Sequence, residues 1–275
     1  MRAILNMFKL AGKTAVIIGG TGILGSAIAK GLGKAGANIV ICYHITSADK
    51  LIGELKKEKI ISEAYYIDVM DKEKIKDCSD KIIKDFSSID ILVNAAGGEV
   101  KKATTSEELS FFDLPSSALK RVMELNLFGG TIIPCQVFGR TMVKNKEGGS
   151  IINISSMNAF RPLTRTVGYS TAKAAVNNFT QWLAVYFAQN YNKKLRVNAI
   201  APGFFLTRQN HFLLLNKYEN FTPRAKSIIS HTPMNKFGKP EDLIGTCIWL
   251  ASDASRFVTG TIIPVDGGFN AYLGV

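Results

Sequence analysis

Tyr169 and Lys173 lie four residues apart at the start of a predicted helix, so their side chains project from one face. A tyrosine hydroxyl, with an ordinary pKa of about 10, is a poor base at neutral pH, but a nearby ammonium lowers that pKa. Such a pair can move a proton to or from an alcohol or carbonyl oxygen. The pair alone is common on exposed helices. Ser156, thirteen residues before Tyr169 at the end of a predicted strand, favours the catalytic interpretation.

A glycine-rich turn directly follows the first predicted strand and opens a helix. Glycines let the backbone turn tightly and approach a pyrophosphate, while the helix N-terminus offers free N–H groups. In this position, the turn indicates a dinucleotide-binding loop rather than a structural turn. Within residues 19–25, the expected cofactor contacts are Gly19, Thr21, Gly22, Ile23, Leu24 and Gly25.

The second predicted strand ends at Tyr43 and is followed by His44, with no acidic residue before Asp49. An Asp or Glu at this place would hydrogen-bond the ribose 2′-hydroxyl of NAD. Its absence removes a charge that would repel a 2′-phosphate, although no arginine stands ready to hold that phosphate. We expect Tyr43 and His44 to border the cofactor, with NADP(H) favoured over NAD(H).

Strand-like and helix-like segments alternate along all 275 residues. The strand-like runs are continuously apolar, which is typical of a parallel sheet covered by helices on both faces. Strands are expected at residues 14–18, 38–43, 64–67, 89–93, 150–154, 196–200 and 261–265. Helices are expected at 25–34, 48–58, 72–86, 116–144, 169–189 and 241–250, with a kink or close packing near Gly129, Gly130 and Pro134. The pattern predicts one α/β domain over residues 1–275, a Rossmann-type, doubly wound parallel sheet of seven strands.

Residues 204–239 are too long for an ordinary connection, and such insertions tend to be lids or binding loops. This segment lies within a basic stretch, because residues 157–239 contain twelve Lys or Arg and the single acid Glu219. A solvated basic surface, a nucleic-acid patch and a pocket for a small anion all fit that charge. Because no nucleic-acid reader motif is present, we expect a small anionic substrate and no nucleic-acid partner.

The composition, with 47% hydrophobic and 20% charged residues, excludes a disordered or fibrous protein. No apolar run approaches the roughly 18 residues of a membrane helix, so no membrane partner is expected. The four cysteines (Cys42, Cys78, Cys135 and Cys247) and three histidines are scattered. Their spacing argues against a disulfide framework or a metal site and fits a reducing cytoplasm.

The stretch from Ile151 to Lys173, with Ser156 and Tyr169-Ser170-Thr171-Ala172-Lys173, closely resembles the active-site segment of short-chain dehydrogenases/reductases. Further motifs of that family follow in the family's order over essentially the whole chain. They are Asp68-Val69, Asn94-Ala95-Ala96-Gly97, Asn126 within Glu124–Gly129, Pro202-Gly203 with Thr207, and Val265-Asp266-Gly267-Gly268.

The resemblance implies a role for each catalytic side chain. Ser156 would position the substrate oxygen, and Tyr169 would act as general acid in reduction and as base in oxidation. Lys173 would hold the nicotinamide ribose and lower the tyrosine pKa, and Asn126 would anchor a water that connects Lys173 to solvent. Cofactor contacts are implied for Asp68, Val69, Asn94, Ala95, Ala96, Gly97, Pro202, Gly203 and Thr207. The family also implies a homotetramer.

The phosphate loop departs from the family's T-G-x-x-x-G-x-G pattern, because Ile18 replaces the threonine and Ile23 occupies the middle glycine position. This variant resembles a subgroup that reduces keto-uronates, the D-mannonate oxidoreductase (fructuronate reductase)-like proteins. Residues 111–114, 155–165, 201–207 and 268–272 resemble the same subgroup. The resemblance implies interconversion of D-fructuronate and D-mannonate.

A sugar acid needs a partner for its carboxylate, and the planar arginine fork suits that group. We expect at least one of Arg161, Arg165 and Arg208 to bind it, Arg165 first, with Asn158 and Gln209 near the hydroxyl groups. Two alternatives stay open: another reductase of the family, such as a gluconate 5-dehydrogenase or a 3-oxoacyl carrier protein reductase, and a non-catalytic dinucleotide-binding sensor. The complete catalytic set weighs against the sensor, which needs no Tyr–Lys pair.

Overall fold

The apolar runs of the sequence form the strands of one parallel sheet, in the order β3-β2-β1-β4-β5-β6-β7. The computed structural model describes residues 2–206, 214–218 and 220–274. The strands are β1 (Thr14–Ile18), β2 (Asn38–Tyr43), β3 (Ser62–Tyr66), β4 (Ile91–Asn94), β5 (Gly149–Ile154), β6 (Leu195–Pro202) and β7 (Ile262–Val265). The predicted doubly wound, seven-stranded α/β sheet is confirmed, with strand ends shifted by a few residues.

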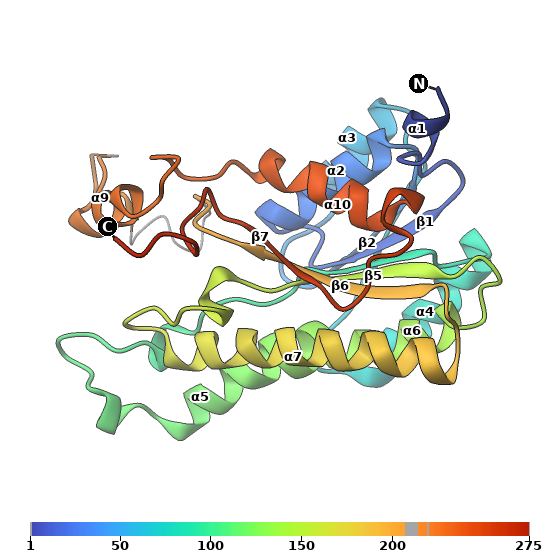
Figure 1. Cartoon of the computed structure of the whole chain (residues 1–275). Coiled ribbons are helices and arrows are strands. Elements are labelled where there is room, and N and C mark those ends of the chain that lie inside the picture. The colour runs from blue at the N-terminus through green and yellow to red at the C-terminus, as the bar shows by residue number, and fades with distance from the viewer. Residues whose placement is uncertain (1, 207–213, 219, 275) are drawn as a thin grey trace.

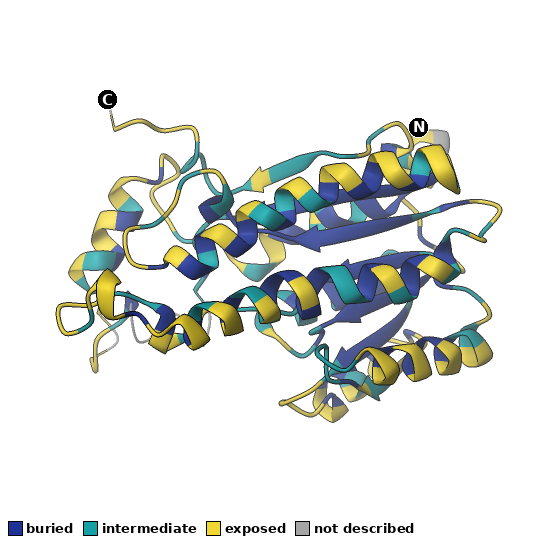
Figure 2. Cartoon of the chain, turned by 90° about the horizontal axis from the view of Figure 1, so that it is seen from below, coloured by how far each residue is buried: buried dark blue, intermediate teal, exposed yellow. Residues whose placement is uncertain are grey.

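Two helical layers cover the two faces of the sheet (Figure 1). One layer holds α2 (Ile23–Lys34), α3 (Asp49–Lys57) and α10 (Ile244–Ala251), and the other holds α4 (Lys72–Phe86), α6 (Ile133–Met142) and α7 (Val167–Asn190). Successive residues of a strand point to opposite faces, so Ile17 joins the core under the first layer and Ile18 the core under the second. Figure 2 shows the resulting pattern of buried and exposed residues.

Shorter elements complete the described chain. They are α1 (Arg2–Asn6), η1 (Lys101–Ala103), η2 (Phe111–Asp113), α5 (Ser116–Met123), η3 (Glu124–Ile132), η4 (Met157–Ala159), α9 (Pro223–Ser230), η5 (Pro240–Leu243) and η6 (Asp253–Ser255). Of the segment predicted to be a lid, the structure describes α9 and its flanks but not residues 207–213 or 219. No helix of the described residues is long and apolar enough to cross a membrane.

The helix predicted over residues 116–144 is not a single α-helix. The π-helical segment η3 separates α5 from α6. Close packing accompanies the change, because a Cβ at Gly130 would lie 2.5 Å from the carbonyl oxygen of Ala96 and one at Gly129 2.7 Å from Met70 Sδ. The close approach expected at the two glycines is therefore present, and the helix changes its winding there.

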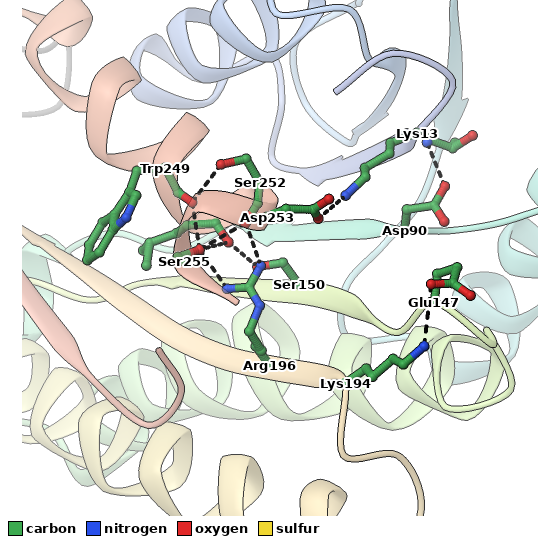
Figure 3. A network of polar contacts seen from close by, with 12 residues as sticks. Lys13, Asp90, Glu147, Ser150, Lys194, Arg196, Trp249, Ser252, Asp253 and Ser255 are labelled. Atoms are coloured by element: carbon green, nitrogen blue, oxygen red, sulfur yellow. Dashed lines mark hydrogen bonds and ion pairs between the residues drawn. The ribbon is translucent and has the colours of Figure 1, made fainter. Parts of the chain in front are cut away.

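A buried arginine connects β6 to the end of α10 (Figure 3). Arg196 donates to Ser255 Oγ at 2.8 Å and to the carbonyl oxygen of Ser252 at 3.1 Å. Ser150 of β5 donates to the Leu250 carbonyl oxygen at 2.7 Å. These contacts satisfy carbonyl groups that the C-terminus of α10 leaves free. Arg196, one of the cations of the basic stretch, therefore has a structural role inside the protein.

Candidate functional site

The glycine-rich turn lies where the order of the strands reverses, between β1 and its neighbours β2 and β4. In open α/β sheets this switch point is where dinucleotides bind. Gly19 has a φ of 74°, and its N–H donates to the Cys42 carbonyl oxygen at 2.9 Å. A Cβ at Gly25 would lie 2.4 Å from the Gly19 carbonyl oxygen, so this close turn requires glycine.

The N-terminus of α2 is open toward that turn. Its N-cap, Gly22, makes no side-chain capping bond, and the first turn, with Ile23 and Leu24, contains no acidic residue. Free N–H groups and the positive end of the helix dipole therefore face the loop that carries Thr21. The arrangement can hold a pyrophosphate, as the sequence predicts.

Beyond this loop, the ends of β2 and β3 bring Tyr43, His44, Asp68 and Val69 to one edge of the sheet. The His44 Nε2 atom lies 3.9 Å from Asp68 Oδ2, and the His44 ring lies 5.4 Å from the ring of Tyr66. Asp68 also accepts from the Met70 N–H at 2.9 Å. A carboxylate therefore stands beside His44, although none ends the second strand itself.

Asn94 at the end of β4 connects the centre of the sheet to α7 through a chain of hydrogen bonds. Its Nδ2 donates to Asn153 Oδ1 at 2.9 Å, and Asn153 donates to Thr180 Oγ1 at 2.9 Å. All three residues are buried. Ala95, Ala96 and Gly97 continue past this polar chain toward the glycine-rich turn, where Gly19 approaches Ala96 closely. The motif thus forms the floor of the predicted cofactor site.

Ser156, Tyr169 and Lys173 converge at the carboxyl end of β5, as their spacing predicts. Ser156 is buried directly beyond that strand, and Tyr169 and Lys173 lie in the first two turns of α7. The Lys173 Nζ atom lies 5.6 Å from the centroid of the Tyr169 ring and donates to the Ile154 carbonyl oxygen at 2.8 Å. The ammonium thus has a fixed position beneath the tyrosine.

The pKa values of this pair reflect burial. Surrounding protein raises the pKa of Tyr169 to about 12; a hydrogen bond with Ser156 acts in the lowering direction, and the negative charge of Glu99 raises the pKa further. Burial lowers the pKa of Lys173 to about 8. The prediction of a lowered Tyr169 pKa is therefore wrong for the free protein, because desolvation of the phenolate outweighs the favourable interactions.

Asn126 lies fully buried within η3 and contacts the loop that follows β4. Its Oδ1 accepts from the Gly98 N–H at 2.9 Å, and its Nδ2 donates to the carbonyl oxygens of Gly98 at 2.8 Å and Val122 at 3.0 Å. The side chain predicted to be the fourth catalytic group therefore fixes the backbone beside Lys173.

The predicted substrate residues that the structure describes have different partners. Asn158 is buried in η4, and its N–H donates to Ser156 Oγ at 3.2 Å. Arg161 donates to the Tyr272 carbonyl oxygen at 3.0 Å. Arg165 is exposed. Thr207, Arg208 and Gln209 lie outside the described residues.

Pro202 and Gly203 end β6 next to β7, where the Gly203 N–H donates to the Val265 carbonyl oxygen at 2.9 Å. A Cβ at Gly203 would lie 2.6 Å from the Cα of Asp266, so only glycine fits there. This pair stands at the same edge of the sheet as Ser156, which is where the family resemblance places the nicotinamide contacts.

Two charged residues near the site were missed by the sequence analysis. Glu99 follows the Asn94–Gly97 motif directly, and its charge acts on Tyr169. Arg224 lies in the first turn of α9, and its charge acts on Glu99. Glu99 could have been found from its position after the motif. For Arg224, the sequence gives no indication of a place near the site beyond its position in the basic stretch.

Sequence comparison finds relatives over nearly the whole chain. A family model described as Enoyl-(Acyl carrier protein) reductase matches residues 21–270. An uncharacterized oxidoreductase of Bacillus subtilis, UxuB, is 45% identical over 97% of this chain and 98% of its own length. A 2-dehydro-3-deoxy-D-gluconate 5-dehydrogenase of Formosa agariphila is 36% identical over 98% of this chain and 97% of its own.

Solved structures share the fold over a similar extent. A candidate D-mannonate oxidoreductase from Haemophilus influenza, with bound NAD, has a TM-score of 0.90 and 43% identity, covering 99% of this chain and 100% of that one. A candidate 2-deoxy-D-gluconate 3-dehydrogenase from Agrobacterium tumefaciens, with bound NADP, has a TM-score of 0.82 and 31% identity, covering 97% and 99%.

Proposed function

Because the chain belongs to the short-chain dehydrogenase/reductase family and is an NAD(P)-dependent oxidoreductase acting on a CH–OH group, we propose that it interconverts a keto-sugar acid and its hydroxy acid. The specific pair proposed is D-fructuronate and D-mannonate. The observation that carries the proposal is the convergence of Ser156, Tyr169 and Lys173 beside the cofactor loop. The sugar-acid names of full-length relatives support the substrate class.

In this mechanism, Ser156 hydrogen-bonds the substrate oxygen and Tyr169 moves the proton. The nicotinamide, when bound, supplies or accepts the hydride. With a pKa of about 12 in the free protein, Tyr169 is protonated at neutral pH and so ready to act as the acid in reduction. Lys173, held by the Ile154 carbonyl oxygen, directs its ammonium to the ring of Tyr169. As the family resemblance implies, it would also hold the nicotinamide ribose of a bound cofactor.

Related structures hold NAD or NADP, and for this chain we propose NADP(H) as the favoured cofactor. Support comes from the absence of an acid at the end of β2, while the Asp68 carboxylate beside His44 acts against a 2′-phosphate. Steady-state kinetics with both cofactors test the proposal. Asp68→Asn, which keeps an oxygen for the Met70 N–H, should raise kcat/KM for NADP(H) relative to NAD(H). A strong preference of the unaltered protein for NAD(H) would overturn it.

A second candidate function is the oxidoreduction of a gluconate derivative at C5, which the name of the Formosa agariphila relative favours. The test is a panel of keto-uronates, aldonates and deoxy-gluconates assayed with both nicotinamide cofactors. Higher kcat/KM for D-fructuronate than for every gluconate derivative is the expected result. Turnover of neutral alcohols or acyl thioesters alone would overturn the sugar-acid proposal.

We propose a homotetramer in the cytoplasm as the working state. Trp182, Val185 and Tyr186 form an exposed apolar stripe along α7, and Trp182 stacks on Tyr186 with ring centroids 4.8 Å apart. A second surface lies at the edge strand β7, near the fully exposed Phe257. Two separate apolar surfaces suit a dimer of dimers. The four buried free cysteines support a reducing compartment.

A further inference from the structure

Glu99 follows a backbone segment that is fixed beside the catalytic side chains, and its own side chain is partly exposed. Gly97 and Gly98 have φ values of 145° and 154°, which favour glycine. A Cβ at Gly97 would lie 3.6 Å from Lys173 Nζ and 2.6 Å from Asn126 Oδ1. Asn126 binds both polar groups of the Gly98 backbone. The backbone position of the next residue, Glu99, is therefore fixed near Lys173. Glu99 thus follows directly on backbone that lies beside Lys173, and its charge acts on Tyr169.

Arg224 reaches this edge of the sheet on α9. The Thr222 Oγ1 atom caps the helix by accepting from the Ala225 N–H at 3.2 Å. Ala225 and Ile228 are buried in an apolar cluster that includes Phe204, the residue after Gly203. This cluster attaches α9 to the segment that follows β6. In Figure 1, α9 lies beyond the carboxyl end of β6. Arg224 itself is half-buried.

Glu99 and Arg224 are close enough to influence each other without forming an ion pair. The positive charge of Arg224 lowers the pKa of Glu99, against the larger effect of burial, which raises it. Within the described part of the chain, no ion pair joins the two side chains. An anion near them would be attracted toward Arg224 and repelled from Glu99, and hence from Tyr169, on which Glu99 acts.

We propose that Arg224 binds the carboxylate of the sugar acid and that Glu99 orients the molecule, repelling its acid end from Tyr169 and accepting hydrogen bonds from its hydroxyl groups. This inference rests on the proposed function. It suits a sugar acid that reacts at C5, because C5 lies toward the end of the carbon chain opposite the C1 carboxylate. The guanidinium can pair with that carboxylate through two parallel hydrogen bonds. The sequence analysis favours Arg165 for the carboxylate. Because Arg165 is exposed, it serves as the comparison for Arg224 in the experiment.

The test compares Arg224→Gln with two matched changes, Lys226→Gln on the exposed side of α9 and Arg165→Gln. Each variant is assayed with D-fructuronate and D-mannonate, and with D-fructose and D-mannitol, in which a CH₂OH group replaces the carboxylate. Arg224→Gln should raise KM for the acids by about 10- to 100-fold, equivalent to about 1.4–2.8 kcal/mol. It should leave kinetics with the neutral compounds and the thermal midpoint near their original values. Arg224→Lys should recover part of the loss.

The outcomes separate the two proposals. If the unaltered protein turns over sugar acids and Arg224→Gln keeps their KM, the role of Arg224 is overturned and the proposed function stands. A selective loss in Arg165→Gln instead would give that role to Arg165. If the unaltered protein accepts only neutral substrates, both proposals fall.

Glu99→Gln tests the orienting role separately. Without the repelling charge, a sugar acid can also bind in reverse, so kcat and KM for the acids should fall by the same factor while kcat/KM changes little. Neutral compounds should show no such paired fall. Unchanged kcat and KM for the acids would overturn the role of Glu99. Glu108→Gln, an exposed change in the same loop, is the control.

Discussion

Asn126 holds Gly98 by both of its backbone polar groups, accepting from the N–H at 2.9 Å and donating to the carbonyl oxygen at 2.8 Å. The contact joins η3 to the loop after β4, and that loop continues into Glu99, whose charge acts on Tyr169. A buried amide with these hydrogen bonds holds the two segments together.

Asn126→Asp should disturb both the fold and the reaction. The carboxylate loses the donor to the carbonyl oxygens of Gly98 and Val122 and places a negative charge against them. We expect a loss of about 1–3 kcal/mol in the free energy of unfolding and a fall in kcat. Urea denaturation and steady-state kinetics measure the two effects. Unchanged stability would show that the contact is dispensable.

Tyr169→Phe removes the hydroxyl that we propose donates the proton, and it keeps the ring above Lys173. Turnover should fall to background, while the affinity for the nicotinamide cofactor stays nearly the same. Fluorescence titration of the cofactor and initial rates give the two readouts. If most of kcat survives in this variant, another group moves the proton.

Replacing Glu99 by Gln should change the pH dependence of alcohol oxidation. The Glu99 charge raises the pKa of Tyr169, so its removal lowers that pKa and makes the phenolate available at lower pH. The rising limb of kcat/KM for oxidation should therefore move toward lower pH, while kcat/KM for reduction at neutral pH, which uses protonated Tyr169, should change little. A pH profile that coincides with that of the original protein would contradict the assigned effect of Glu99.

Arg196→Met should destabilise the protein more than the loss of a surface charge does. The variant removes the donors to Ser255 and Ser252 inside the protein, at an expected cost of about 1–3 kcal/mol. Lys13→Ala, which breaks an ion pair of 3.0 Å with the exposed Asp253, should cost about 0–1 kcal/mol. Denaturant titration of both variants gives the comparison, and equal losses would contradict a structural role for Arg196.

The strands and the convergence of the proposed catalytic residues could be predicted because their signals are local. Ile17 and its neighbours form a continuous apolar run, and Ser156, Tyr169 and Lys173 lie within one strand–loop–helix unit. The π-helical winding of η3 could not be predicted in the same way, since it depends on contacts of Gly129 and Gly130 with distant segments. Glycine and proline in that helix indicated only where regular winding would fail.

The electrostatics of the site also depend on the folded state. The spacing of Tyr169 and Lys173 suggested a lowered tyrosine pKa, but the surrounding protein raises it to about 12. Likewise, Glu99 and Arg224 are distant in sequence, and it is the apolar cluster beneath α9 that brings the arginine to the edge of the sheet. Sequence position favoured Arg165, which the fold leaves exposed.

The π-helical winding of η3 lets this region hold an extra residue without turning α5 and α6 relative to each other, because a π-helical turn closes over one residue more than an α-helical turn. Deleting one residue from a continuous α-helix would turn its two sides relative to each other by about 100°. Between Leu127 and Ile132, a change to α-helical winding can absorb the same deletion. A shortening that would displace a helix elsewhere in the protein is therefore one that this segment can accept.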